Sequence, residues 1–251
     1  MSTNRPFSLS IAGFDPSAGA GVLADIKTFE QHQVYGLAIN TANTIQTENN
    51  FLAIDWTPID FILQSIETLF QAYAIKAIKI GVVSSLESLT LIVSLIKKIS
   101  PETKIVWDTV LKSTTKFDFL SIRNQKDLIA ILDKIELITP NYNEILKLNT
   151  SENSAEKIAQ ELSQYCNVLL KGGHHPTKKG TDYLYYKTQQ IKLNPNPTTI
   201  FPKHGSGCVL SAAITANLSL DQDLLTACQN AKKYTETFLS STLSQLGHHY
   251  V

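Results

Sequence analysis

The sequence is poor in cysteine and lacks long hydrophobic runs. Its 251 residues include 3 cysteines, Cys166, Cys208 and Cys228, which are widely spaced and form no C-x-x-C pair. This pattern excludes a disulfide framework and a structural zinc site of the usual kind. No segment of about 18 uninterrupted apolar residues occurs, and no apolar core follows a charged N-terminus, so we expect neither a membrane span nor a signal peptide. The sequence predicts a cytoplasmic protein with reduced thiols.

The charge is balanced, with 22 Lys plus Arg against 22 Asp plus Glu and no basic run. Binding to nucleic acid or to an anionic membrane is therefore not expected, and local geometry must hold any anionic ligand. Hydrophobic residues make up 43% of the chain. A chain of this length and composition predicts one α/β domain over residues 1–251.

Short apolar segments alternate with longer segments that have helical periodicity. The pattern predicts a mainly parallel sheet with helices on both faces, and ligands at the carboxyl ends of its strands. A hairpin is predicted at 182–194, and two helices close the chain. The predicted strands are 7–13, 35–42, 75–81, 104–108, 136–140 and 167–173, and the helices between them begin near Gly19 or cover 60–73, 86–99 and 125–135.

The first glycine-rich segment, "DPSAGAGVLADIKTF", fits the G-x-G-x-x-A form of a dinucleotide fingerprint at Gly19, Gly21 and Ala24. That site needs its first glycine directly after a strand and an acidic residue at the end of the next strand. Here "FDPSA" follows Gly13, and the next strand ends in "NTANTIQ". The glycines therefore indicate a turn that begins a helix.

Asp25 lies beside the apolar stripe of that helix, which contains Val22 and Phe29. Such a carboxylate either turns to solvent or faces the interior, where it needs a partner. Periodicity alone leaves both possibilities open.

Asn141 and Glu144 follow a strand and a proline in "ITPNYNEILKL". Their spacing fits a helix cap, with Asn141 at the N-cap and Glu144 three residues later. The same amide and carboxylate could orient water around Mg²⁺, which binds few protein ligands.

The segment "HGSGC", followed by an apolar helix, predicts an anion site. Gly205 and Gly207 let the backbone bend so that N–H groups point into one hollow, and the helix N-terminus adds positive potential. The alternative is a glycine-rich helix start that is capped by Ser206. No G-x-x-x-x-G-K-[S/T] motif occurs, so an ordinary P-loop is excluded.

In this order along the chain, "IAGFDPSAGAGVLADIKTF", "TIQTENN", "IKIGVVSS", "WDTVL", "LITPNYNEI", "LLKGGH" and "HGSGCVLSAAI" resemble one family. It is the hydroxymethylpyrimidine and phosphomethylpyrimidine kinases of thiamine biosynthesis, in the ribokinase-like superfamily. The resemblance implies a three-layer α/β/α sandwich. It also implies transfer of the ATP γ-phosphoryl group to 4-amino-5-hydroxymethyl-2-methylpyrimidine and then to its monophosphate.

The resemblance further implies roles for individual residues. Those matching Asp25 and Gln46 hydrogen-bond the aminopyrimidine, and the substrate would give Asp25 its partner. Residues matching Gly13, Val82 and Val110 line the ring site. Near ATP and Mg²⁺, the residues that the resemblance implies are Asp108, Asn141, Glu144 and Lys171, with Glu144 reaching the metal through water and Asp108 a possible metal ligand.

Cys208 stands where other ribokinase relatives carry the aspartate that takes the proton of the attacking hydroxyl. With Gly205, Ser206 and Gly207, it would form the catalytic segment. A thiol at a helix N-terminus is expected to have a lowered pKa and partial thiolate character, so that it can accept this proton. It would also repel an incoming phosphate less than a carboxylate would.

Two alternatives stay open. Pyridoxal kinase activity would use a similar heteroaromatic alcohol, and a non-catalytic ligand-binding module could use the same fold. The family also leads us to expect a homodimer. Residues 112–119, "KSTTKFDF", contain no glycine where the family has a flexible Ser-Gly loop, so lid residues are not assigned.

Overall fold

The computed structural model describes residues 5–111, 124–149, 154–175, 177–186, 188–196 and 198–250. In these ranges the strands form one nine-stranded sheet in the order β3-β2-β1-β4-β5-β6-β7-β8-β9. The strands are β1 (Phe7–Phe14), β2 (Tyr35–Gln46), β3 (Phe51–Trp56), β4 (Ile75–Ile80), β5 (Lys104–Trp107), β6 (Leu137–Ile138), β7 (Asn167–Leu170), β8 (Asp182–Tyr186) and β9 (Gln189–Leu193).

The helices connect these strands and close the chain. They are α1 (Gly21–Gln31), α2 (Ile59–Ala72), α3 (Leu86–Ile99), α4 (Gln125–Leu132), α5 (Tyr142–Leu148), α6 (Ala155–Leu162), α7 (Ser206–Ser219) and α8 (Leu224–Ser240), with a short 3-10 helix at Gly172–His174. Each predicted helix is present. The first begins two residues later than expected, and α6 was not predicted.

The centre of the sheet is parallel and its edges are antiparallel. β2, β1, β4, β5, β6 and β7 pair in parallel. β3 pairs antiparallel with the end of β2, and the predicted hairpin forms β8 and β9. β3 was not predicted, although its sequence "FLAIDW" is mostly apolar. It is an edge strand, and its apolar side chains, such as Leu52, are exposed.

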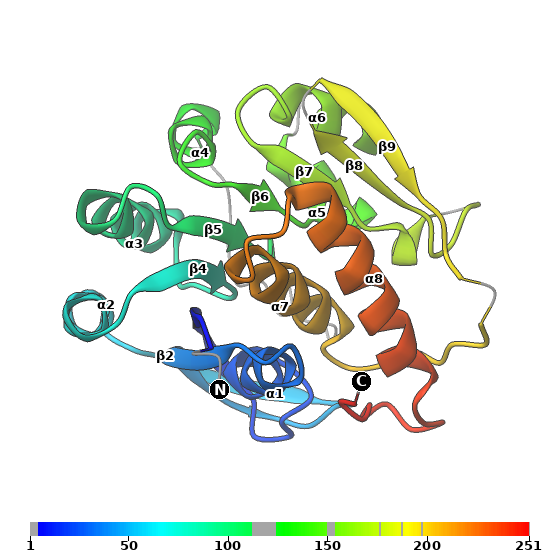
Figure 1. Cartoon of the computed structure of the whole chain (residues 1–251), viewed down its shortest axis with the longest axis horizontal. Helices are drawn as coiled ribbons and strands as arrows, with labels where there is room; N and C mark the ends of the chain where they lie inside the picture. The colour runs from blue at the N-terminus through cyan, green and yellow to red at the C-terminus, as the bar shows by residue number, and fades with distance from the viewer. Residues whose placement is uncertain are drawn as a thin grey trace.

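Helices lie in two layers, one on each face of the sheet (Figure 1). Alternate residues of the central strands pack against one layer or the other. Ile78, Ile105 and Ile138 pack with the helices α2 to α6, whereas the neighbouring residues Ala77 and Val106 pack with α7 and α8. This is the alternation of a strand that is buried on both faces. The predicted three-layer α/β/α architecture is confirmed.

α7 is covered on all sides. Every residue from Val209 to Ser219 is buried, and its small side chains lie against the sheet, α1 and α8. Alanines such as Ala212 and Ala216 let these elements approach closely. The alanine-rich sequence after "HGSGC" thus fixes the start of α7 at the carboxyl ends of the strands.

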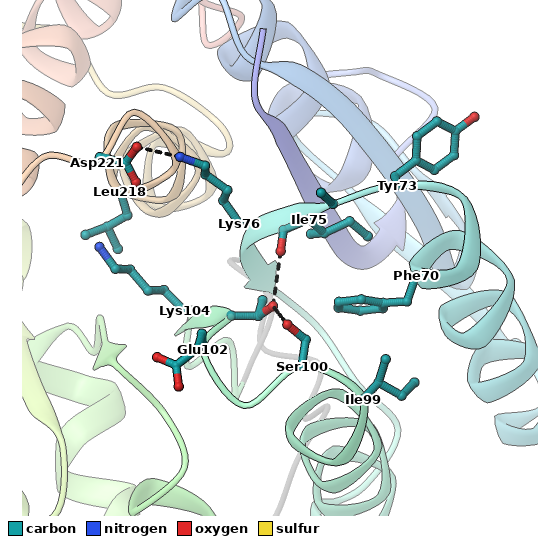
Figure 2. A pocket seen from close by; sticks show the side chains of 12 residues that line it. Phe70, Tyr73, Ile75, Lys76, Ile99, Ser100, Glu102, Lys104, Leu218 and Asp221 are labelled. Carbon is teal, nitrogen blue, oxygen red and sulfur yellow. Dashed lines mark hydrogen bonds and ion pairs between the residues drawn. The ribbon is translucent and has the colours of Figure 1, made fainter. Parts of the chain in front are cut away.

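A pocket of about 460 Å³ lies at the other end of the sheet. It is formed by the amino ends of β4 and β5 and by the C-terminal ends of α2, α3 and α7 (Figure 2). Its walls combine apolar residues such as Phe70 with the charged groups of Lys76, Lys104 and Asp221. In the described ranges, no helix is both long and apolar enough to cross a membrane.

Candidate active site

The residues predicted for the site all follow or end strands on the carboxyl side of the parallel sheet, or begin the helices there. Gly13 and Gln46 end β1 and β2, and the remaining positions lie in the segments after β4 to β7 and at the starts of α1, α5 and α7. This is the edge at which an open α/β sheet binds ligands. In order, the residues are Gly13, Asp25, Gln46, Val82, Asp108, Val110, Asn141, Glu144, Lys171, Gly205, Ser206, Gly207 and Cys208.

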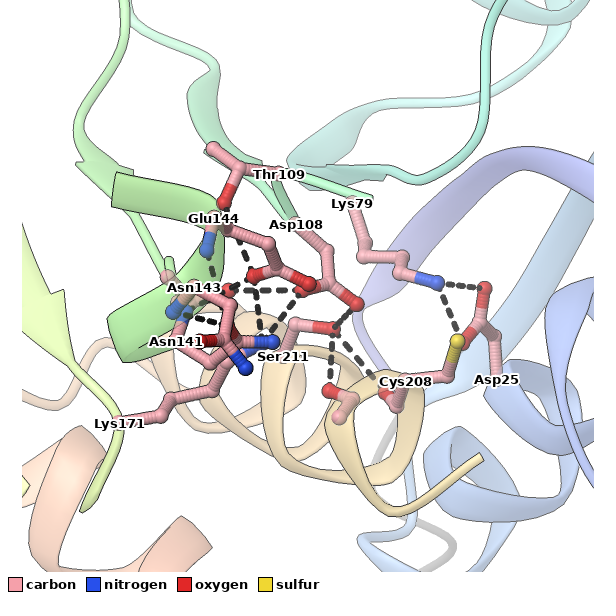
Figure 3. Close-up of polar contacts among 12 residues, drawn as sticks. Asp25, Lys79, Asp108, Thr109, Asn141, Asn143, Glu144, Lys171, Cys208 and Ser211 are labelled. Atoms are coloured by element: carbon pink, nitrogen blue, oxygen red, sulfur yellow. Dashed lines mark hydrogen bonds and ion pairs between the residues drawn. The ribbon is translucent and has the colours of Figure 1, made fainter. Parts of the chain in front are cut away.

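Asp108, Glu144 and Lys171 form one charged cluster (Figure 3). Lys171 Nζ lies 3.0 Å from Asp108 Oδ1 and 3.8 Å from Glu144 Oε2. The hydroxyl of Thr139 donates to the same Asp108 oxygen at 3.1 Å. Three successive strands, β5, β6 and β7, thus bring two carboxylates and one ammonium group together.

This cluster adjoins the glycine loop at the start of α7. A Cβ placed on Gly207 would lie 3.3 Å from Lys171 Nζ and 3.8 Å from Asp108 Oδ2. The hydroxyl of Ser211, one turn further along α7, donates to Asp108 Oδ2 at 3.3 Å. Because the first N–H groups of a helix have no partners within the helix, they and the Lys171 ammonium can bind the same anion.

The cluster keeps Asp108 and Lys171 charged. Burial raises the pKa of Asp108, but Lys171 and Lys79 lower it more, so the net pKa lies below the usual value. Burial lowers the pKa of Lys171, but Asp108 and Glu144 raise it above the usual value. For Glu144, burial outweighs the attraction of Lys171, and its pKa is raised.

Asn141 and Glu144 form the predicted capping box. Asn141 Oδ1 accepts from the backbone N–H of Glu144 at 2.9 Å, and Glu144 Oε2 accepts from the backbone N–H of Asn141 at 2.8 Å. The hydroxyl of Thr109 also donates to Glu144 Oε2, at 3.4 Å. The capping interpretation is confirmed, and it orients the Glu144 carboxylate toward Lys171.

Asp25 is completely buried, so the solvent-facing alternative is wrong. Its carboxylate pairs with Lys79 Nζ at 2.8 and 2.9 Å and accepts from the hydroxyl of Ser10. Asp25 therefore does not lack a partner, contrary to our expectation. Burial raises the pKa of Asp25, while Lys79 opposes this rise. Burial would lower the pKa of Lys79, but Asp25, Cys208 and Asp108 raise it, so the ammonium stays charged.

Cys208 points toward the Asp25 and Lys79 pair (Figure 3). Burial raises its pKa to about 11, the positive charge of Lys79 opposes this, and the carboxylates of Asp108 and Asp25 add to the rise. The prediction of a lowered thiol pKa is therefore wrong. The helix N-terminus and the Gly21 N–H favour a thiolate, but burial between two carboxylates has the larger effect.

The glycine loop begins α7 without a side-chain cap. Gly205 is the N-cap residue, with a left-handed φ of 74°, and Ser206 is the first helical residue, so capping by Ser206 is wrong. A Cβ at Gly205 would lie 1.9 Å from the carbonyl oxygen of Gly19. Glycine is required here by both the backbone angle and the close approach of the first loop.

The residues expected around the substrate ring make different contacts with their neighbours. A Cβ on Gly13 would lie 2.9 Å from Val82 Cγ1, and the backbone of Val82 accepts from the Thr41 hydroxyl at 2.7 Å. The Val110 N–H donates to the Asp108 carbonyl oxygen at 2.7 Å. Gln46, half-buried, pairs with Phe51 of β3. The segment with unassigned lid residues, 112–119, lies outside the described residues.

Sequence reasoning missed several residues of the site. Lys79 could have been noticed, because a lysine within the apolar strand "IKAIKI" needs a buried partner. Asp15 and His204, which join the two glycine-rich loops, are 189 residues apart and give no local signal. Thr139 and Ser211 also give no local signal, because each matters only through its hydrogen bond to Asp108 in the folded chain.

Comparison with known proteins identifies relatives of this chain. A family profile described as Phosphomethylpyrimidine kinase matches residues 15–251. The chain is 34% identical to a hydroxymethylpyrimidine/phosphomethylpyrimidine kinase of Aquifex aeolicus (strain VF5), over 97% of each chain. The crystal structure of phosphomethylpyrimidine kinase from Clostridium difficile 630 superposes with a TM-score of 0.77 at 30% identity, covering 92% of this chain and 98% of that chain.

A second enzyme of the same fold is also similar. The pyridoxal kinase from Staphylococcus aureus in complex with AMP-PCP and pyridoxal gives a TM-score of 0.81 at 26% identity, covering 95% of this chain and 89% of that chain. The higher identity and the matching profile both favour the pyrimidine kinases. The chain belongs to the phosphomethylpyrimidine kinase family.

Proposed function

We propose that this chain transfers the γ-phosphoryl group of ATP to the hydroxymethyl group of 4-amino-5-hydroxymethyl-2-methylpyrimidine and then to the resulting monophosphate. The observation that carries this proposal is the contact between the cluster of Asp108, Glu144 and Lys171 and the glycine loop of α7. Phosphoryl transfer depends mainly on positioning and on stabilising the charge of the equatorial oxygens. Fixed N–H groups and a charged lysine supply both.

In this proposal ATP places its phosphates between Asn141, Lys171 and the N-terminus of α7. Lys171 stays protonated, because two carboxylates raise its pKa. It can therefore neutralise charge on the transferred group throughout the reaction. Gly13, Gln46, Val82 and Val110 surround the pyrimidine ring, and the buried pair of Asp25 and Lys79 lies next to Cys208.

The residues present also fit Mg²⁺. In the described ranges, no group of three or more His, Cys, Asp or Glu side chains could hold a metal ion by itself. Magnesium usually binds through one or two carboxylates together with water and substrate phosphates, so Asp108 and Glu144 are sufficient. When bound, the ion would neutralise phosphate charge. Glu144 would hold the ion through water, and Asp108 is the carboxylate that could bind it directly.

Cys208 contributes as a neutral thiol in this mechanism. Its pKa of about 11 leaves it protonated near neutrality, so it is not the base that takes the proton from the substrate hydroxyl. A loose transition state makes little demand on a base. A neutral group also adds no repulsion when the acceptor is the monophosphate, whose nucleophile is already an anionic oxygen. The second transfer is therefore compatible with the same site.

A substrate panel tests the proposed function. ADP release would be measured with the pyrimidine, its monophosphate, pyridoxal and pyridoxine, and thermal shifts would report binding in parallel. We expect the highest kcat/KM with the pyrimidine and measurable turnover of its monophosphate. A preference for the vitamin B6 alcohols would instead favour pyridoxal kinase activity. Binding without turnover of any compound would favour a non-catalytic module.

We also propose that the chain forms a homodimer. The family resemblance motivates this proposal, and the edge formed by β2 and β3 supports it. Ile45 and Leu52 on this edge are 61% and 74% exposed. Exposed apolar side chains on a sheet edge favour association with another chain. Analytical ultracentrifugation is expected to give the dimer mass, and a monomer at all concentrations would refute this proposal.

A further inference from the structure

The carboxylate of Asp15 organises the first loop, which covers residues 15–20. It is 1% exposed and accepts from the backbone N–H groups of Ser17 and Ala20, both at 2.9 Å. The Ser17 hydroxyl contacts the same carboxylate at 2.8 Å. One buried group therefore fixes the path of the loop between β1 and α1.

The same carboxylate reaches the glycine loop, residues 204–208, through a histidine. Asp15 Oδ2 lies 2.8 Å from His204 Nε2, and the two side chains are 1% and 8% exposed. Burial raises the pKa of Asp15, but hydrogen bonds from His204 and Ser17 lower it more, so the carboxylate is ionised. An ionised carboxylate only accepts hydrogen bonds, so Nε2 carries the proton and donates.

The two loops are in direct backbone contact at this point. A Cβ on Gly19 would lie 2.7 Å from His204 Cδ2, and one on Gly205 would lie 1.9 Å from the carbonyl oxygen of Gly19. The hydrogen bond between Asp15 and His204 thus fixes the relative position of two surfaces that already touch. A small displacement here would move the first N–H groups of α7.

The other nitrogen of His204 has no such link. Within the described part of the chain, Nδ1 is the one buried side-chain nitrogen or oxygen without a hydrogen-bond partner. The hydrogen bond from Nε2 to Asp15 is therefore the one that holds this side chain within the described part of the chain. Because only Nε2 has a partner, substitutions that keep a donor at one nitrogen position or the other can test the role of each.

We propose that His204 is a positioning residue, which through its Nε2 bond to Asp15 holds the glycine loop in place against the first loop. Gly205, Gly207 and Cys208 then present their backbone to the transferred phosphoryl group in a fixed arrangement. This inference rests on the proposed function. His204 itself contacts neither the phosphates nor the hydroxymethyl group.

Two amide substitutions test the role of Nε2. The side-chain nitrogen of glutamine lies near the position of a histidine Nε2, and that of asparagine near Nδ1. His204→Gln therefore keeps a donor toward Asp15, whereas His204→Asn does not. Misplacement of a reacting group by about 1 Å can lower the rate by about 100-fold. We expect kcat of His204→Asn to be at least about tenfold below that of His204→Gln, with a smaller change in KM.

A double-mutant cycle with Asp15→Asn identifies the partner. Asp15→Asn also takes away an acceptor of the first loop, where Asp15 Oδ2 accepts from the Ala20 N–H. It should therefore still lower kcat in His204→Asn, but by a smaller factor than in the wild type, so the two effects are not additive. Additive effects, or equal kcat values for the two His204 variants, would overturn the proposal. Higher activity of His204→Asn than of His204→Gln would also overturn it, because function would then lie with Nδ1.

Hydrogen exchange gives a readout that does not depend on turnover. Peptides covering residues 13–21 should exchange faster in His204→Asn than in the wild type, and His204→Gln should resemble the wild type. The same substitutions at the exposed His248 serve as controls and should change neither exchange nor kcat. If the wild type fails to phosphorylate the pyrimidine, the proposed function fails, whereas unchanged exchange in His204→Asn refutes the positioning role itself.

Discussion

β4 carries two lysines that pair with aspartates at opposite ends of the sheet. Lys76 pairs with Asp221 beside the pocket at the amino end, where the two side chains are 47% and 73% exposed. Lys79 pairs with Asp25 next to Cys208 at the carboxyl end, where both side chains are 0% exposed. The chemical groups are the same, and only their burial differs.

Burial changes what each pair can do. Water screens the exposed pair, so Lys76 and Asp221 gain little from each other. The buried pair is not screened, and Lys79 acts on Asp25, Cys208 and Asp108 together. A single lysine therefore influences the charge of the whole site, whereas a lysine three residues earlier on the same strand affects only the surface.

The largest expected effect comes from breaking the buried pair. Lys79→Met leaves the Asp25 carboxylate buried without a cation, with only the Ser10 hydroxyl as a donor, which should lower the free energy of unfolding by about 3–5 kcal/mol. Lys76→Met, the matched control, should leave it unchanged within error. Urea denaturation measures both.

A double substitution sharpens this comparison. Replacing both members of a buried pair by apolar residues is often neutral, so adding Asp25→Leu to Lys79→Met should recover part of the lost stability. Equal stabilities of Lys79→Met and Lys76→Met would show that burial does not distinguish the two pairs.

A smaller effect is expected from replacing Asp108, whose carboxylate lies beside Lys171 and the glycine loop. Asp108→Asn removes the charge that holds Lys171 at 3.0 Å beside the glycine loop. Loss of one preorganised electrostatic contact typically lowers kcat by about 10²–10³. Asp221→Asn, at the other end of the sheet, should have wild-type kinetics. Similar kcat values for both variants in steady-state assays would contradict the assignment.

The smallest effect is expected at Cys208. The pKa of its thiol is about 11, so the thiol is protonated near neutrality. Titration of this group therefore does not change kcat in that pH range. A general base usually contributes a factor of about 10²–10⁴ to the rate, and we expect kcat of Cys208→Ala to fall by less than the lower end of that range. Its dependence of kcat on pH should parallel that of the wild type between about pH 6 and pH 9. A wild-type rise in this range that the variant lacks would restore the thiolate mechanism.

Local patterns in the sequence predicted the fold well. Strands such as "IKAIKI" and "KIVW" are apolar on both faces, and glycine, proline or aspartate marks their ends, so the order of elements follows from neighbouring residues. This order of elements also predicts that ligands bind at the carboxyl ends of the parallel strands. The cap of Asn141 and Glu144 was also predictable, because it lies within four residues.

Contacts between distant segments were not predictable. Asp25 and Lys79 are 54 residues apart. A lysine in an apolar strand calls for a buried partner, but no local pattern shows that Asp25 is that partner. The Cys208 pKa was predicted in the wrong direction because the helix N-terminus is a local feature, whereas burial between Asp25 and Asp108 arises only on folding. β3 was missed for a related reason, since its pairing with β2 places it at an exposed edge.

Hydrogen exchange with ligands tests most directly whether the chemistry lies at the carboxyl end of the sheet. Exchange would be compared with and without ADP, Mg²⁺ and the pyrimidine. We predict protection of peptides covering residues 139–149 and 204–212, and no change in residues 70–76 and 99–104 around the pocket at the amino end. Protection confined to that pocket, with unchanged exchange at the glycine loop, would contradict the assignment.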